Sequence, residues 1–259
     1  TVAFLFPIFL VLMNSFKNKL YISDAPFALP NSDTFSGMYN YVNGIQKTGL
    51  LVAAGRSAFI TICSVIVIVL LTSMAAWWIT RVTCKLSTVL YYLFVFAMIV
   101  PFQMVMFTLS KVTDFLHLGN MFGIIPVYLG FGAGLSLFMF CGFIKAIPIS
   151  LEEAAMIDGC TPVQTYFKII VPMLRPTMIT VAILNAMWIW NDYLLPTLVL
   201  DSEKPTIPMA VQYLRGGYGS IDMGAMMAML VLAILPIIVF YLTCQKYIIK
   251  GVAAGAVKG

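Results

Sequence analysis

The polar side chains that can take part in recognition are concentrated in one short segment, residues 150–172, which reads SLEEAAMIDGCTPVQTYFKIIVP. Long apolar stretches flank it on both sides, so we expect it to face water and to contact another protein. Ser150 can cap a first helix, with Glu153 three residues later as its reciprocal partner. Gly159 suits the left-handed turn that ends such a helix. The chemistry predicted here is docking by a capped helix, with no catalytic residues.

A second helix is predicted directly after this glycine. Thr161 can cap it, with Pro162 at its first position and Gln164 at its third. Pro172 is expected to stop the run. The resulting helix–glycine–helix unit would present three apolar side chains to a partner, namely Ala154, Ala155 and Ile157. The alternative is a generic capped helix hairpin.

A second group of polar residues lies in an otherwise apolar stretch, residues 173–200. Asn185, Trp188 and Asp192 recur at steps of three and four, so they share one face of a predicted helix. Together with Asn191 they can line a wet pathway for a polyhydroxylated solute, because amides and carboxylates bond hydroxyl groups and aromatic faces stack on sugar rings. An ionisable group in a span is costly and usually faces a cavity or a partner. The alternative is an interfacial cap and subunit contact at headgroup depth.

The elements that must position these residues are membrane-spanning helices. Of the 259 residues, 61% are hydrophobic and only 10% are charged, whereas about 25% are charged in an ordinary soluble domain. A spanning helix needs roughly 20 mostly apolar residues. We therefore expect an all-α integral membrane protein that forms a single transmembrane domain over residues 1–259. About six transmembrane helices are predicted, over residues 1–16, 50–80, 86–110, 119–145, 173–200 and 223–248.

Proline and glycine mark two of these predicted spans. Pro101 and Gln103 fall inside the third, where a proline kinks the helix and its neighbours must satisfy the freed carbonyl. Gln103 is a further candidate for the solute pathway. The fourth span contains Pro126 and four glycines, Gly130, Gly132, Gly134 and Gly142. Two alternatives stay open: the glycines permit close helix packing, or they break the helix beside a translocation path.

Residues 17–49 form the longest stretch predicted to lie outside the membrane. Their Pro, Asn, Ser and Gly content indicates an irregular loop. Phe27, Tyr39 and Tyr41 suit either a docking surface or a loop folded over its own helices. The chain begins with Thr1 rather than Met, so we expect the true N-terminus to lie upstream.

Several other kinds of chemistry are excluded by the sequence. The five cysteines have no C-x-x-C spacing and His117 has no ligand partner nearby, so neither a metal site nor a disulfide framework is expected. The chain has no G-x-x-x-x-G-K-[ST] phosphate loop, so it is not expected to hydrolyse ATP itself. Lys and Arg are dispersed, mainly at the ends of spans, so no nucleic-acid partner is expected.

The segment 150–172 resembles the cytoplasmic loop of permease subunits in bacterial ABC importers. That loop has the pattern EAA, three residues, Gly, nine residues and I-x-L-P. The matching residues are Glu153, Ala154, Ala155, Gly159, Ile169 and Pro172. Asp158 before the glycine also matches, and Val171 replaces the usual Leu while keeping an apolar side chain.

The end of the chain resembles the sugar-importer branch of that family. QKYIIKGVAAGAVKG at 245–259 and WNDYLLP at 190–196 fit its usual patterns. The resemblance runs through most of the chain from the second span onward. The subunit most resembled is the shorter of the two permeases in maltose-type and related oligosaccharide importers.

This resemblance implies a set of partners. They are a second permease in a heterodimer, two cytoplasmic ABC ATPase subunits, an extracytoplasmic solute-binding protein that would contact residues 201–220, and membrane lipid. The resemblance places the chain as a multi-pass protein in the bacterial cytoplasmic membrane. ATP and Mg²⁺ would be bound by the ATPase subunits, so no cofactor is expected on this chain. The cargo implied is a carbohydrate, best matched by an oligosaccharide.

The resemblance also implies which residues couple transport to ATP hydrolysis. Residues 150–172, called the coupling loop below, would dock in a groove of an ATPase subunit. The coupling residues would be Glu152, Glu153, Ala154, Ala155, Asp158, Gly159, Pro162 and Pro172. The cytoplasmic tail, 249–259, would reach the ATPase pair through Lys258 and Gly259. The inside placement rests on the resemblance, because eight Lys and Arg would lie inside against seven elsewhere, which is a weak bias.

Three other functions stay open. An ion-coupled secondary transporter would need several intramembrane ionisable groups as a relay, and only Asp192 and Arg56 qualify. A membrane scaffold or sensor would give no reason for the coupling loop. An importer of amino acids, peptides or ions would not explain the GAVKG ending.

Overall fold

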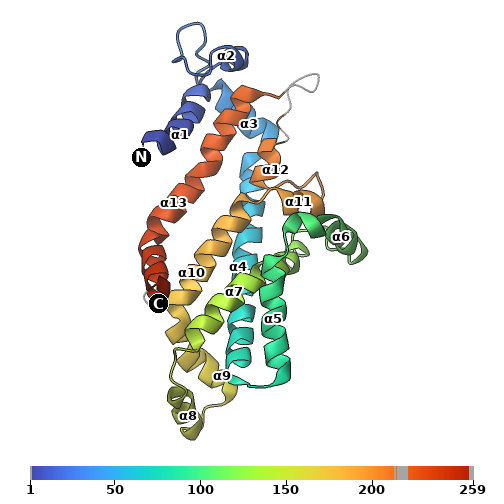
Figure 1. Ribbon diagram of the computed structural model, residues 1–259. Helices are drawn as coiled ribbons and strands as arrows, with labels where there is room; N and C mark the ends of the chain where they lie inside the picture. The colour runs from blue at the N-terminus through green and yellow to red at the C-terminus, as the bar shows by residue number, and fades with distance from the viewer. Residues whose placement is uncertain (1, 213, 215–220, 257–259) are drawn as a thin grey trace. The chain divides into compact units, whose positions relative to one another are not determined.

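The computed structural model of the protein describes residues 2–212, 214 and 221–256, and these residues form helices with no strand and a single isolated β-bridge. The predicted all-α fold is confirmed. In chain order the helices are α1 (Val2–Asn14), α2 (Lys19–Asp24), α3 (Tyr39–Thr48), α4 (Leu50–Arg81), α5 (Lys85–Ile99), α6 (Phe102–Phe115), α7 (Ile124–Ile144), α8 (Ser150–Ile157), α9 (Pro162–Thr165), the π-helical turn η1 (Tyr166–Ile170), α10 (Val171–Asn191), α11 (Leu194–Val199), α12 (Ile207–Gln212) and α13 (Met223–Ala256) (Figure 1).

Four helices are long and apolar enough to cross a membrane: α4, α7, the continuous run Pro162–Asn191, and Met223–Lys246 of α13. A fifth span is counted if α5 and α6 are taken together, although they are bent by 106°. The apolar part of α1, Ala3–Asn14, is shorter than a span. The predicted count of six spans is therefore not confirmed.

The break between α5 and α6 is larger than the kink predicted from Pro101. Val100 has extended backbone angles, with φ −69° and ψ 119°, and Pro101 is the first residue before α6. A proline disfavours helical geometry in the residue before it and lacks an amide donor. These two effects end α5 and start a new helix in another direction.

The described chain divides into two compact units. Unit 1 comprises residues 1–59 and 191–242, and unit 2 comprises residues 60–190 and 243–259. Both α4 and α13 contribute residues to each unit. The coupling loop lies wholly within unit 2.

Unit 1 contains the segment 17–49, in which α2 and α3 flank residues 25–38, and this middle part is irregular as predicted. The Lys17 ammonium is buried, and Nζ donates to the carbonyl of Ala25 at 2.9 Å. The amide of Asn40 donates to the carbonyls of Ser15 and Lys17 at 2.8 and 2.7 Å. Burial lowers the pKa of the Lys17 side chain. Tyr41 is buried, as expected for a segment folded over its own helices, whereas Phe27 and Tyr39 are 70% and 68% exposed, so the docking surface stays a prediction.

The core of unit 2 is formed by α4, α7, η1 and α10. Its fully buried side chains are Ala76, Leu137, Phe140, Ile144, Ile170, Leu174 and Val181. Apolar residues from these four elements pack together at the base of the coupling loop.

Two of the glycines in α7 permit close packing within unit 2. A Cβ on Gly132 would lie 2.7 Å from Ile68 Cδ1 and 2.8 Å from Asn185 Oδ1, and one on Gly134 would lie 2.9 Å from the carbonyl oxygen of Phe94. The helix α7 is unbroken from Ile124 to Ile144. Of the two alternatives for this span, helix packing is confirmed.

Candidate functional site

The first helix of the coupling loop, α8, begins without the cap predicted from Ser150. Ile149 is the residue before the helix, it is already helical with φ −63° and ψ −27°, and no side chain caps the helix. The backbone carbonyls of Pro148 and Ile149 accept the first helical amides instead, including those of Leu151 and Glu152. The predicted Ser150–Glu153 capping box is therefore wrong, because the turn before the helix already supplies these acceptors.

The end of α8 has the geometry predicted from Gly159. This residue has φ +85°. The Gly159 amide donates to the carbonyl of Met156 at 3.0 Å, and the Cys160 amide donates to that of Ala155 at 2.9 Å. This pair of bonds is the Schellman motif, which requires a left-handed residue at this position. The elbow between the two helices is thus fixed by Gly159.

The second helix begins as predicted but does not end where expected. The Thr161 hydroxyl accepts from the Gln164 amide at 3.3 Å, and the Gln164 side chain accepts from the Thr161 amide at 2.8 Å. The prediction that Pro172 stops the run is wrong, since the helix continues to Asn191. The wider turn η1 ends at Ile170, two residues before Pro172, and accommodates a ring that has no amide to donate.

A buried ion pair ties α8 to the end of α4. The residue Glu152 is only 4% exposed, and Arg81 Nη2 lies 2.7 Å from its Oε1. Trp77 Nε1 donates to the other oxygen, Oε2, at 2.9 Å. Arg81 also donates to the carbonyl of Ile147 at 2.9 Å. Glu152, predicted as one of the coupling residues, thus points into the protein, and its partners hold the coupling loop on α4.

A second buried contact ties η1 to α4. The hydroxyls of Ser73 and Tyr166 lie 2.7 Å apart. The ring of Tyr166 also packs at 5.5 Å between centroids against that of Trp77. The sequence reasoning missed Ser73 and Tyr166 as anchors. The available signal in the sequence was the aromatic and basic end of the second predicted span, with Trp77 and Arg81.

The opposite side of the coupling loop is exposed. Among its predicted coupling residues, those with exposed side chains are Glu153, Ala154, Asp158, Pro162 and Pro172. Ala155 is buried, whereas Ile157 is 86% exposed. Further exposed apolar residues flank it, namely Met156, Val163 and Phe167. The exposed edge therefore combines large apolar side chains with two carboxylates, at the end of unit 2 that carries α8 and α9 (Figure 1).

Of the predicted pathway residues, Asn185 and Trp188 lie on α10, Asn191 is its exposed last residue, and Gln103 lies on α6. Asn185 is buried, and its amide donates to the Ser136 hydroxyl and to the carbonyl of Val181. Trp188 packs edge-on against Tyr128, and Gln103 on α6 is exposed. These contacts give Asn185 a packing role within unit 2, whereas Trp188 packs against Tyr128 on one side and stays 39% exposed.

The prediction that Asp192 shares a helix face with Asn185 is wrong, because α10 ends at Asn191. Asp192 Oδ1 instead accepts from the amides of Leu194 and Leu195 at 3.1 and 3.4 Å. It stabilises the first turn of α11, which is the capping role foreseen as its alternative.

Two further expectations concern the tail and metal binding. The tail residues Lys258 and Gly259 lie outside the described residues, and α13 continues as helix to Ala256. In the part of the chain that the structure describes, no three His, Cys, Asp or Glu side chains gather to hold a metal ion.

The family of this chain follows from a comparison with known protein families. A family described as binding-protein-dependent transport system inner membrane component matches residues 68–254. The chain belongs to this family. It is therefore a multi-pass membrane component of a transport system, in a family whose members are permease subunits rather than enzymes.

Individual relatives share nearly the whole length of this permease. It is 40% identical to the "Probable starch degradation products transport system permease protein AmyC" of Thermoanaerobacterium thermosulfurigenes, over 97% of the chain and 91% of that protein. It is 38% identical to the "Multiple sugar-binding transport system permease protein MsmG" of Streptococcus mutans, over 98% and 92%. A chain of a bacterial ABC transporter that imports the acidic polysaccharide alginate has the same fold, with a TM-score of 0.78, 22% identity, and coverage of 95% and 91%.

Proposed function

We propose that this permease is one of two membrane subunits of an ABC importer for a carbohydrate, best matched by an oligosaccharide. The printed names of AmyC and MsmG both refer to sugar transport, and each is similar over almost the full chain. A second permease would complete the pathway, and a binding protein would deliver the solute. The pathway candidates with exposed side chains, Gln103, Trp188 and Asn191, are the residues we assign to solute contact.

The coupling loop would transmit the motion of a separate ATPase to the spans. The observation that carries this proposal is the rigid attachment of the coupling loop: Glu152 is bonded to Arg81 and Trp77 of α4, and the helix from Pro162 runs unbroken to Asn191. A displacement of α8 would therefore move α4 and α10 with it. When ATP closes the ATPase pair, its greater affinity for the closed state would bias the spans toward the outward-open arrangement.

The exposed edge of the coupling loop supplies the surface for that contact. Ile157 and Val163 are 86% and 65% exposed, and an apolar edge of this kind is suited to burial in a groove of a partner. Glu153 and Asp158 can then meet basic residues at the rim. ATP and Mg²⁺ would be bound by the ATPase, consistent with the lack of a phosphate loop in this chain.

Reconstitution tests the proposed function. The permease would be co-expressed with the neighbouring permease and ATPase genes and reconstituted with binding protein loaded from a panel of sugars. Stimulation of ATP hydrolysis by one loaded sugar is expected. Flat hydrolysis with every sugar in an assembled complex would contradict the carbohydrate proposal and favour a different solute. Uptake that follows an ion gradient and does not require ATP would favour the secondary transporter.

A matched pair of variants tests the docking surface. Ile157→Glu should abolish co-purification with the ATPase, because the new charge would be buried at the contact. Leu29→Glu places the same charge at an exposed apolar residue outside the coupling loop and should leave the complex intact. Equal recovery of the ATPase with both variants would show that the coupling loop does not dock there.

A further inference from the structure

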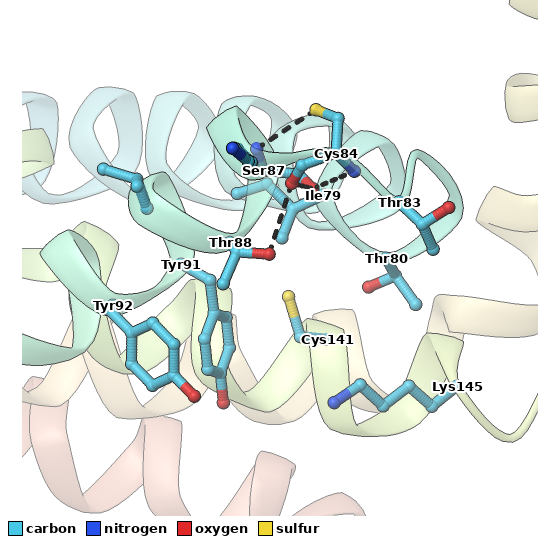
Figure 2. Close-up of a pocket in the computed structure, with 12 residues that line it drawn as sticks. Ile79, Thr80, Thr83, Cys84, Ser87, Thr88, Tyr91, Tyr92, Cys141 and Lys145 are labelled. Carbon is cyan, nitrogen blue, oxygen red and sulfur yellow. Dashed lines mark hydrogen bonds between the residues drawn. The ribbon is translucent and has the colours of Figure 1, made fainter.

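An open pocket lies in unit 2 at the level where several spans end. It is formed by the end of α4, the start of α5 and the end of α7, and its volume is about 830 Å³ (Figure 2). None of the residues that line it belongs to the set of coupling residues. The pocket thus has no part in the function proposed above.

The lining of this pocket carries positive charge without a carboxylate. Lys85, the first residue of α5, and Lys145, the residue that follows α7, both line it and are both exposed. The Lys145 ammonium lies 5.7 Å from the centre of the Tyr91 ring, toward which it points in Figure 2. None of the lining residues is Asp or Glu. Two lysines in a concave site whose lining has no carboxylate favour an anion, with further hydroxyl donors such as that of Thr83 close by.

The depth of the pocket suits the headgroup layer of a membrane. The spanning helices α4 and α7 end here, at Arg81 and Ile144. Tyr91 and Tyr92 line the pocket, and tyrosines are typical of the interface between lipid and water. A basic pocket between spanning helices at this depth is the kind of site that binds anionic lipid headgroups.

An apolar track leads from the pocket along α5. Val89, Tyr92 and Phe96 are 59%, 64% and 66% exposed, and they follow one another at steps of three and four residues on one helix face. This track can cover an acyl chain. A free phosphate would gain nothing from it, and two lysines in an open pocket are screened by salt. The charge and the track together point to an amphiphilic anion.

We propose that this pocket binds an anionic phospholipid, with the phosphate between Lys85 and Lys145 and an acyl chain along the Val89–Phe96 face of α5. The bound lipid would hold α5 against α7 at the membrane surface. This proposal does not depend on which solute the permease carries.

Native mass spectrometry of the assembled transporter tests the proposal directly. The complex would be titrated with phosphatidylglycerol, and with phosphatidylcholine as the uncharged comparison. Lys85→Gln or Lys145→Gln should each weaken phosphatidylglycerol binding about fivefold, and the double variant about thirtyfold. Lys145→Arg should bind as the parent does. Lys246→Gln, an exposed lysine at the end of another span, is the matched control and should also bind normally.

Other occupants of the pocket give different results. Unchanged phosphatidylglycerol binding in the double variant would overturn the proposal. Displacement of the lipid by soluble glycerol phosphate at equal concentration would show a phosphate site without an acyl contribution.

Cys84 reports whether a protein subunit covers the pocket instead. Its thiol is exposed at the pocket, and a hydrogen bond from the Ser87 amide lowers its pKa, which favours alkylation. Maleimide should modify Cys84 more slowly, relative to Cys244, in phosphatidylglycerol nanodiscs than in phosphatidylcholine nanodiscs. Equal protection in both lipids would assign this face to a neighbouring subunit and overturn the lipid proposal.

Discussion

Two nitrogens of the Arg81 guanidinium contact the same carboxylate oxygen of Glu152, with Nε at 2.8 Å and Nη2 at 2.7 Å from Oε1. The side chains are 17% and 5% exposed, so water does little to screen the pair. The two residues lie at the last turn of α4 and the first turn of α8. This contact joins the first helix of the coupling loop to the end of a membrane span.

The first prediction concerns this ion pair. Glu152→Gln leaves the Arg81 guanidinium largely buried without its counter-charge, so the complex should lose about 2–3 kcal/mol of stability. Stimulation of ATP hydrolysis by loaded binding protein should fall with it. Melting of the purified complex and its ATPase activity are the measurements. Glu153→Gln, one residue away and exposed, should change stability by no more than about 0.5 kcal/mol. Equal effects of the two substitutions would contradict the anchoring role.

The second prediction concerns the elbow at Gly159. A Cβ there meets no atom within 4 Å, so the cost of Gly159→Ala comes from its φ of +85° alone. A side chain in this conformation costs about 1–2 kcal/mol. The α8–α9 angle should relax, and ATPase stimulation should drop while the complex still assembles. Gly142→Ala, which also meets no atom but lies inside the helix α7, is the control. Normal stimulation of ATP hydrolysis in the Gly159→Ala variant would show that the turn at Gly159 is not needed for coupling.

The third prediction separates the glycines of α7. Gly132→Ala would push against Ile68 Cδ1 and Asn185 Oδ1, and overpacking of this kind costs about 1–3 kcal/mol. Gly130→Ala meets nothing within 4 Å and should be neutral or slightly stabilising. Thermal melting of the two variants side by side measures the difference. Equal melting temperatures of the two variants would contradict the role of Gly132 in close helix packing.

The fourth prediction concerns pH and lies in unit 1. Asp222 Oδ2 accepts from Lys47 Nζ at 2.9 Å and from Asn43 Nδ2 at 3.0 Å, while Oδ1 accepts from the Ala225 amide at 3.2 Å. Burial alone would raise the pKa of Asp222. The hydrogen bonds and charge of its partners outweigh burial and hold the pKa below its ordinary value.

The sign of the pH effect follows from this lowered pKa. Asp222 stabilises the fold fully above its unfolded pKa of about 3.9, and this contribution is lost as the pH falls toward the lower folded value. Asp222→Asn should therefore melt below the parent at pH 7, with a loss of about 1–2 kcal/mol, and the gap should close below about pH 4. Asp33→Asn, at an exposed aspartate, should show no such gap. A difference in stability between Asp222→Asn and the parent that grows as the pH falls would contradict the prediction.

Much of the local structure followed from the sequence because it depends on contacts between near neighbours. The left-handed turn at Gly159 and the Thr161–Gln164 capping box each involve residues only a few positions apart, and both are found as predicted. The apolar runs predicted the long helices for the same reason, since a spanning helix satisfies its own backbone. The resemblance of residues 150–172 to permease loops likewise led to the family that the comparison establishes.

The tertiary structure decided which way these elements face and how far they run. Glu152 and Glu153 are adjacent acidic residues in one helical turn, and only Arg81 and Trp77, more than 70 positions earlier in the chain, make the first an internal anchor and leave the second exposed. Pro172 ends no helix because the π-helical turn before it makes room for the ring. Pro101 separates two helices by 106° where the sequence predicted a kink. Contacts with residues distant in the sequence selected the direction of Glu152, whereas at Pro172 and Pro101 the local preference permitted more than one backbone geometry and the structure has one of them.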